Sequence, residues 1–195
     1  TDTWPAGFDP HTISAIAATR VFNQVYETLL TFNKDMKFGG VLAESWENPD
    51  DVTYVFHLRH GVKFHNGREM TSADVVYSFD RILGKTEYGD IGALGSSASY
   101  FGGVESVEAL DDYTVKFTLK QPDPTFTMNL TLWCGFIVSE AAVNDLGEAF
   151  NRTPVGTGPY EFVDAKFQEF CEMQKFDGYW GTPADVDRVV TYYIT

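Results

Sequence analysis

Hydrophobic residues recur at helical spacing in two segments of the chain. In the first, apolar residues lie three to five positions apart, which predicts a helix over about residues 17–30. The second begins at Thr71 or Ser72, since either hydroxyl can cap a helix whose first turn is acidic. Arg81 in its last turn, with Gly84 following, is typical of a helix end. The residues expected on the buried side of this second helix are Val75, Val76, Phe79, Ile82 and Leu83.

Apolar and polar residues alternate elsewhere, as expected for strands with one buried face. In the first such segment, Tyr54, Phe56 and Leu58 fall on one side. A later segment predicts a hairpin, because Asp111 and Asp112 supply turn residues between two alternating runs. The segments predicted as strands are residues 53–59, 104–109, 113–119, 136–138, 160–163, 170–176 and 189–194.

Turn-forming residues separate these elements. Residues 84–103 carry six glycines and three serines, which predicts a long loop. Because long loops in compact proteins are often functional, this segment is the best loop candidate for ligand contact. Short helices are predicted over residues 126–133 and from Ser139 to Gly147. Residues 154–159 (PVGTGP) are expected to form a rigid turn.

The composition limits the class of protein. With 195 residues, 44% of them apolar and 15% aromatic, the chain is expected to be globular rather than disordered. Fourteen basic and 28 acidic residues give a net charge of −14, which repels phosphate backbones and anionic lipid surfaces. Nucleic acid is therefore not an expected partner. No apolar run of about 18 residues occurs, so no membrane span is expected in this chain.

Candidate chemical motifs are few. His57, His60 and His65 lie close in sequence, but no carboxylate or thiolate stands at a matching offset, so ordinary histidines are favoured over a metal site. Gly156 and Gly158 precede a proline and a strand rather than a helix, which favours a structural turn over a phosphate loop. No nucleophile, base and orienting group occur as a motif, and we expect neither an enzyme nor a cofactor.

The two cysteines leave alternatives open. Cys134 and Cys171 are too far apart for a CxxC motif and too few for a disulfide scaffold. One bridge in an oxidising compartment would stabilise the fold by about 3 kcal/mol. Both residues also lie in segments where a buried thiol packs well, and free thiols are the preferred interpretation.

Five motifs, in the same order along the chain, resemble a known family. Residues 43–64 (AESWENPDDVTYVFHLRHGVKF) and the following TSADVVYSFDR resemble the signature region of extracytoplasmic solute-binding proteins of peptide-type ABC importers. The dipeptide- and oligopeptide-binding proteins are the relatives that these residues resemble most. The other matching segments are FDPHTIS with VFNQVYETLLTFN, LDDYTVKFTLKQPDPTF, and TPVGTGPYEF with FDGYWGTPADVDRVV.

The resemblance implies a mixed α/β fold of the type II periplasmic binding protein class, with two lobes joined by a hinge. Members of the family are longer than this chain. By analogy, residues 1–30 and 154–195 belong to a first lobe, and residues 31–153 form most of an inserted subdomain. The second lobe, which usually supplies the charged groups that bind the ligand's ends, is expected to lie outside this sequence.

The resemblance also implies candidate ligand contacts. Ser14, Ala15 and Ile16 occupy positions that line the cleft in peptide binders, where small side chains allow close backbone approach. The alternative is that they only begin the first helix. Ser99, Tyr100 and Phe101 form the second set, because an aromatic ring with a hydroxyl can pack on a ligand and hydrogen-bond to it. Anchoring of the loop is the alternative for these residues.

The function implied by the resemblance is capture of a small ligand, a di- or oligopeptide, for delivery to a membrane ABC permease. A periplasmic or extracellular location follows, with a lipid anchor as one mode of attachment. The alternative is an interaction, chaperone-like or signalling module that uses the same fold without transport. A hydrolase has no positive support in the sequence.

Overall fold

A computed structural model describes residues 5–13, 16–86 and 95–193. Its strands are β1 (Leu30–Phe32), β2 (Phe38–Gly40), β3 (Ala43–Asp50), β4 (Thr53–Leu58), β5 (Val104–Asp111), β6 (Thr114–Leu119), β7 (Tyr160–Lys166), β8 (Phe170–Lys175) and β9 (Arg188–Tyr192). Its α-helices are α1 (Ile16–Val25), α2 (Ser72–Ile82), α3 (Gly95–Phe101), α4 (Phe126–Asn129) and α5 (Glu140–Leu146). The 3₁₀ helices are η1 (Trp133–Gly135) and η2 (Gly147–Asn151).

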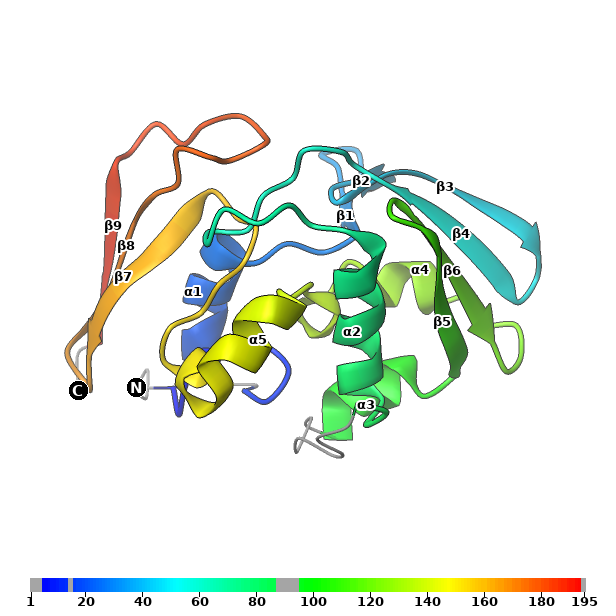
Figure 1. The fold of residues 1–195 in the computed structure, drawn as a ribbon, viewed down its shortest axis with the longest axis horizontal. Coiled ribbons are helices and arrows are strands. Elements are labelled where there is room, and N and C mark those ends of the chain that lie inside the picture. Colours follow the sequence, from blue (N-terminus) through cyan, green and yellow to red (C-terminus); the bar gives the residue numbers. More distant parts are fainter. Residues whose placement is uncertain (1–4, 14–15, 87–94, 194–195) are drawn as a thin grey trace.

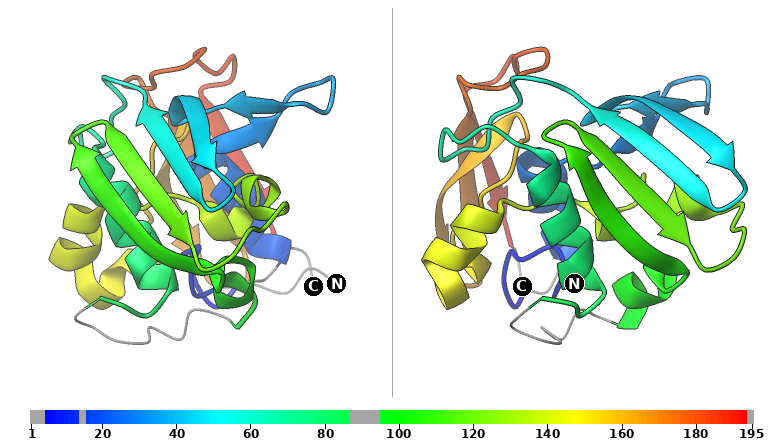
Figure 2. Two further views of the ribbon diagram at one scale, coloured as in Figure 1. Left: turned by 90° about the vertical axis from the view of Figure 1, so that its right-hand side faces the viewer. Right: turned by 45° about the vertical axis from the view of Figure 1, so that its right-hand side comes forward.

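The strands form two larger antiparallel sheets and a short ribbon. One sheet has the order β3-β4-β6-β5, the other has the order β7-β8-β9, and β1 pairs with β2. Figure 1 shows the three-stranded sheet on the left, the four-stranded sheet on the right, and α1, α5 and α2 between them. The right-hand view of Figure 2 shows the same order, with α2 lying beside the four-stranded sheet. The described part of the chain is therefore a mixed α/β structure.

Two hydrophobic cores lie on the two sides of α2. The larger core covers the inner face of the four-stranded sheet, where Phe56 and Phe117 meet edge to face with ring centroids 5.5 Å apart. Phe79 of α2 packs edge to face against Phe117, with ring centroids 4.8 Å apart. The smaller core joins α1 to β8 and to the region of α5 through Phe22, Met173 and other apolar residues. Helix α2 thus stands at the junction of the two cores.

The strongest periodic segments fold as predicted. Helix α2 begins after Thr71, which forms a capping box with Asp74, and it is followed by Gly84 at φ +68°. In β4, Tyr54, Phe56 and Leu58 are buried, as the alternation indicated. Both predicted hairpins form, as β5-β6 and β7-β8, and the last predicted strand pairs with β8 as β9. Ser139 caps α5 by accepting a hydrogen bond from the Ala142 N–H.

Three predictions of local structure are wrong. The first helix ends at Val25 instead of near residue 30, because its carbonyl accepts a hydrogen bond from the Gly158 N–H at 2.9 Å. Residues 136–138 form no strand, because the Ile137 N–H donates to the Glu27 carbonyl rather than to a sheet. The long loop at residues 84–103 contains α3, whose Phe101 is buried in the larger core. The sequence pattern does not predict β1, β2 or β3. In β3, Pro49 and the many exposed residues hide the alternation.

The two cysteines lie in different cores. Cys134 packs with the larger core and Cys171 with the smaller one, and both are free thiols. Burial raises the pKa of Cys134 to about 11 and that of Cys171 to about 12. The structure therefore agrees with the preferred interpretation of buried thiols that pack as small apolar residues.

Candidate functional site

The turn before α1 is organised by Asp9. Its side-chain carboxylate accepts a hydrogen bond from the His11 N–H at 3.0 Å, and its main-chain carbonyl accepts from the N–H groups of Thr12 and Ile13. The Asp9 N–H in turn donates to the Asn151 side-chain oxygen at 3.1 Å. Because Asp and Pro favour turns, residues 9 and 10 fold locally, but Asn151 ties that turn to η2 across 142 positions of the chain.

A buried ion pair joins this turn to α2. The two terminal nitrogens of Arg81 donate to the two carboxylate oxygens of Asp9, at 2.9 and 2.5 Å, in the forked geometry that Arg and carboxylate prefer. Asp9 and Arg81 are only 5% and 6% exposed. Burial raises the pKa of the Asp9 carboxyl, but the hydrogen bonds and charge of Arg81 outweigh it, and the net pKa is lowered. Asp9 is therefore ionised and paired.

His11 extends the pair into a hydrogen-bonded chain. Its Nδ1 lies 3.1 Å from an Arg81 nitrogen, which can only donate, so Nδ1 accepts. The Nε2–H then donates to the Phe136 carbonyl at 2.8 Å. Burial, together with the charge of Arg81, lowers the pKa of His11 to about 4. His11 is therefore a neutral imidazole with its proton on Nε2.

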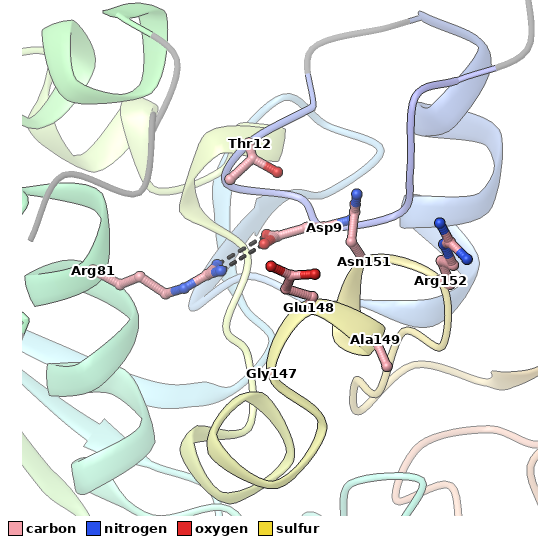
Figure 3. Close-up of a pocket in the computed structure, with 8 residues that line it drawn as sticks. All are labelled: Asp9, Thr12, Arg81, Gly147, Glu148, Ala149, Asn151 and Arg152. Atoms are coloured by element: carbon pink, nitrogen blue, oxygen red, sulfur yellow. Dashed lines mark hydrogen bonds and ion pairs between the residues drawn. The ribbon is translucent and has the colours of Figure 1, made fainter. Parts of the chain in front are cut away.

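An open pocket of about 800 Å³ lies against this ion pair. Figure 3 shows the paired Asp9 and Arg81 on one side and the residues of η2 on the other, with the Glu148 carboxylate near the pair. The pocket wall therefore contains the buried, paired charges of Asp9 and Arg81. It also contains exposed polar side chains, such as that of Glu148. The remaining residues that line it are Thr12, Gly147, Ala149, Asn151 and Arg152.

A second polar cluster surrounds Glu27, directly after α1. Its carboxylate accepts hydrogen bonds from Thr157 Oγ1 at 2.8 Å, Tyr179 OH at 2.9 Å and Trp180 Nε1 at 2.8 Å. The Trp180 ring also faces the Arg59 guanidinium at 4.6 Å. Burial raises the pKa of Glu27, and the three hydrogen bonds only partly oppose this rise. The cluster fastens the loop after β8 to the end of α1.

Residues 154–159 form a structural turn, as predicted, and their glycines also allow close packing on α1. A Cβ on Gly156 would lie 2.0 Å from the Val25 carbonyl oxygen, and one on Gly158 would lie 2.3 Å from that of Gln24. Only glycine allows this approach to the end of α1. His65 completes the contact, because its ring bonds to the Gly158 carbonyl at 3.0 Å and to the Gly156 N–H at 3.3 Å.

The three central histidines contact different parts of the structure. His65 contacts the glycine turn, His60 stacks on Tyr113 with centroids 3.7 Å apart, and His57 lies in β4. Within the described ranges, no group of three His, Cys, Asp or Glu side chains has the arrangement of a metal site. No helix in those ranges is long and apolar enough to cross a membrane.

The candidate ligand residues have different surroundings. Ser14 and Ala15 lie outside the described residues, and Ile16 is the first residue of α1. In α3, Ser99 is exposed and Tyr100 is 42% exposed, whereas Phe101 is 1% exposed and packs edge to face on Phe79. Phe101 therefore belongs to the core rather than to a ligand surface. The start of α1 and α3 lie at the same end of the molecule, the lower one in Figure 1.

Sequence reasoning missed the two polar clusters. The sequence predicts that Arg81 suits the last turn of a helix, yet Arg81 is buried against a partner 72 positions away. One signal was present, because Asp74, Ser78 and Arg81 recur at i, i+4 and i+7 and form a second, polar face on α2. We call these three residues the polar face of α2. For Glu27 we find no comparable signal, because its three donors come from distant segments.

The comparisons with known proteins agree with this structure. Residues 37–195 match the model of the bacterial extracellular solute-binding proteins, family 5 Middle. The glutathione-binding protein GsiB of Pectobacterium atrosepticum is 36% identical over 173 residues, which cover 88% of this chain and 32% of that protein. The chain thus spans about a third of the length of this curated relative.

Solved structures show the same fold. The periplasmic binding protein DppA from Helicobacter pylori, in complex with the peptide STSA, is 32% identical with a TM-score of 0.88, covering 98% of this chain and 41% of that one. The AgaA protein from A. tumefacien R10, in complex with agropinic acid, is 31% identical with a TM-score of 0.85, covering 99% of this chain and 38% of that one. The fold is therefore that of the periplasmic binding proteins. The chain belongs to family 5 of the bacterial extracellular solute-binding proteins.

Proposed function

We propose that the complete protein containing this chain is the solute-binding component of an ABC importer, and that it captures a di- or oligopeptide outside the cytoplasm. The observation that carries the proposal is the match over 98% of the chain to a peptide-bound periplasmic binding protein, at a TM-score of 0.88. The relative named for glutathione, itself a small peptide, supports the same ligand class. Binding and release, with no catalysed reaction, are sufficient for this role.

Residues 1–30 and 154–195 would form part of the first lobe, and residues 31–153 most of the inserted subdomain. The separation of the two cores supports this division, although α5 and Phe150 pack with the smaller core and so fasten the subdomain to the lobe. A membrane permease would be the protein partner. The location would be periplasmic or extracellular, with a lipid anchor as one form of attachment.

The ligand contacts proposed on this chain are Ser14, Ala15 and Ile16 together with Ser99 and Tyr100. Small side chains at 14 and 15 would let a ligand backbone come close, and the exposed Tyr100 offers a ring and a hydroxyl. Of these residues, Ile16 begins α1, and Ser99 and Tyr100 lie in α3; Figure 1 shows the start of α1 and α3 at the same end of the molecule. Phe101 is left out because its ring fills the core.

The test is a thermal melt of the full-length gene product beside this 195-residue chain. Each is heated with and without a pool of di- and tripeptides, glutathione and the tetrapeptide Ser-Thr-Ser-Ala. We expect a higher midpoint for the full-length protein only, because a ligand that binds the native state alone stabilises it, and both lobes enclose the ligand. No rise with any probe would contradict peptide capture.

A further inference from the structure

The pocket beside Asp9 and Arg81 carries charges of both signs on its wall. Asp9 and Arg81 neutralise each other, so this pair adds no net charge to the pocket. The exposed charged groups in the lining are Glu148 and Arg152, one acidic and one basic. The chain as a whole has twice as many acidic as basic residues, 28 against 14. The balanced charge of the pocket therefore differs from the composition of the chain.

The two exposed charges belong to a well-anchored segment, η2 and the residue after it. Phe150 of η2 is 1% exposed and packs in the smaller core, and the Asn151 side-chain oxygen accepts the Asp9 N–H at 3.1 Å. Figure 3 shows Glu148 on the side of the ion pair and Arg152 on the far side of Asn151. Because two neighbouring residues fix this segment, the positions of both charges are set before any ligand binds.

The exposed polar groups of the pocket have unused hydrogen-bonding capacity. Within the part of the chain that the structure describes, the side chains of Glu148 and Arg152 form no ion pair and no hydrogen bond. The Asn151 side-chain oxygen is occupied by the Asp9 N–H, which leaves its NH₂ group as a donor. Thr12 adds a hydroxyl to the same wall. The pocket thus offers one anionic acceptor, one cationic donor and neutral donors.

The dimensions of the pocket suit a short peptide. Its volume of about 800 Å³ lies within the range of about 300–1,000 Å³ that small-molecule sites occupy. Residues 148 and 152 are separated by a rise of about 8 Å, at about 2.0 Å per residue of 3₁₀ helix. An extended di- or tripeptide spans about 7–11 Å, at about 3.3–3.6 Å per residue. The two ends of such a peptide are therefore about as far apart as these two residues.

We propose that this pocket binds a short peptide as a zwitterion, with the peptide's ammonium at Glu148 and its carboxylate at Arg152. The two charges favour one orientation, because a reversed peptide would bring like charges together. Asn151 and Thr12 hydrogen-bond to the peptide between its ends. The inference deepens the proposed function, on which it rests for the choice of a peptide. It places two charged recognition groups on this chain, in addition to those expected in the second lobe.

The experiment measures binding to the full-length protein by calorimetry with three forms of one peptide. These forms are trialanine, N-acetyl-trialanine, which lacks the ammonium, and trialanine amide, which lacks the carboxylate. The variants are Glu148→Gln and Arg152→Gln, each of which removes one charge from an exposed side chain. The matched controls are Glu44→Gln in β3 and Arg188→Gln in β9, which remove the same charges elsewhere on the surface.

We expect Glu148→Gln to weaken the binding of trialanine about three- to fivefold and to leave the binding of N-acetyl-trialanine unchanged. The acetylated peptide has no ammonium, so the substitution and the acetylation should not add in their effects. Arg152→Gln should weaken the binding of trialanine by a similar factor and leave the binding of trialanine amide unchanged. Both control variants should bind all three forms as the wild type does.

A nuclear magnetic resonance titration with millimolar trialanine reports the pocket directly. The side-chain N–H signals of Arg152 and Asn151 should shift in the full-length wild type, whereas that of Arg188 should not. This measurement detects weak binding and does not require enclosure by both lobes. It therefore separates the pocket from the proposed function.

Two calorimetric results would overturn the inference. If trialanine binds and neither variant weakens it, the peptide is held elsewhere, and the proposed function stands. If Glu148→Gln weakens trialanine and its acetylated form equally, Glu148 does not meet the ammonium. Should calorimetry detect no trialanine binding, the titration decides, since shifts at Arg152 and Asn151 support the pocket and unchanged signals reject it. The proposed function fails only if the other peptides of the thermal test also do not bind.

Discussion

The two polar clusters hold a carboxylate away from water by different means. Asp9 faces a guanidinium, and the pair as a whole is neutral. Glu27 accepts from three neutral donors, and the charge of Arg59, which faces the ring of Trp180, lowers its pKa less than burial raises it. Their pKa values consequently move in opposite directions, lowered for Asp9 and raised for Glu27.

The difference shows what each cluster can do. The cluster at Asp9 contains two charges that depend on each other, so the loss of either one leaves the other buried and unpaired. At Glu27 the three donors are neutral, and protonation of the carboxyl removes a charge that burial disfavours. We therefore expect the first cluster to be sensitive to substitution and acid, and the second to tolerate both better.

The largest effect is expected from Asp9→Asn. The amide has nearly the same shape but leaves the Arg81 guanidinium without its counter-charge, which should lower the free energy of unfolding by about 3–5 kcal/mol. Urea unfolding at neutral pH measures the change. A loss below about 1 kcal/mol would show that Arg81 reaches water, and would remove the contrast with Glu27.

Acid should weaken the same cluster through His11. Its pKa is about 4 in the folded protein against an ordinary value of 6.5, so the unfolded chain takes up the proton first as the pH falls. The stabilisation that the neutral His11 ring provides is complete above about pH 6.5 and is lost toward about pH 4. Between about pH 7.5 and about pH 5, the free energy of unfolding should fall by about 2 kcal/mol.

Unfolding of the wild type and of His11→Asn over this pH range isolates the effect. The variant lacks the titrating ring, so the difference in unfolding free energy between the two proteins should shrink as the pH falls. A difference independent of pH would mean that His11 has the same pKa in the folded and the unfolded protein, which contradicts its burial as a neutral ring.

A smaller effect is expected from Glu27→Gln. The amide oxygen can still accept hydrogen bonds, while its NH₂ group replaces one acceptor, so about 1 kcal/mol of stability should be lost. The raised pKa of Glu27 makes stability depend on pH in the opposite direction from His11, because here the native state takes up the proton first as the pH falls. Stability from this carboxyl is therefore present below its ordinary pKa of 4.5 and is lost as the pH rises through the folded value.

The indole N–H resonance of Trp180 provides a local reading of this titration, since it donates to Glu27. It should shift with pH in the wild type and stay constant in Glu27→Gln. A resonance that does not move in the wild type would place the Glu27 pKa outside the range measured and contradict the expected contrast with Asp9.

The smallest effect is expected from Arg188→Gln. Arg188 also donates two hydrogen bonds to one carboxylate, that of Glu172, through its Nε and one terminal nitrogen, but its side chain is 62% exposed. Water screens such a pair, so the unfolding free energy should change far less than in Asp9→Asn. A loss as large as that of Asp9→Asn would show that geometry rather than burial determines the energetic difference.

The sequence determined the elements in which one local signal was sufficient. The alternation of Tyr54, Phe56 and Leu58 fixed the inner face of β4, and the cap at Thr71 with the apolar stripe fixed α2. Turn residues fixed the hairpin at Asp111. In each case the interacting groups are near in sequence, so periodicity and capping describe them. The five family motifs, through their resemblance to known proteins, indicated the fold and the class of function.

Only the tertiary structure decided the rest. Helix α1 ends at Val25 because a glycine turn more than a hundred residues later takes its carbonyl. Phe101 is a core residue because α3 packs on Phe79, which a glycine-rich composition concealed. Arg81 lies in the last turn of α2, where a basic residue is expected, but its guanidinium is buried in the pair with Asp9. The polar positions of α2 indicate a polar face, but they do not show that Arg81 pairs with a carboxylate 72 positions away, because that partner is brought close only by the fold.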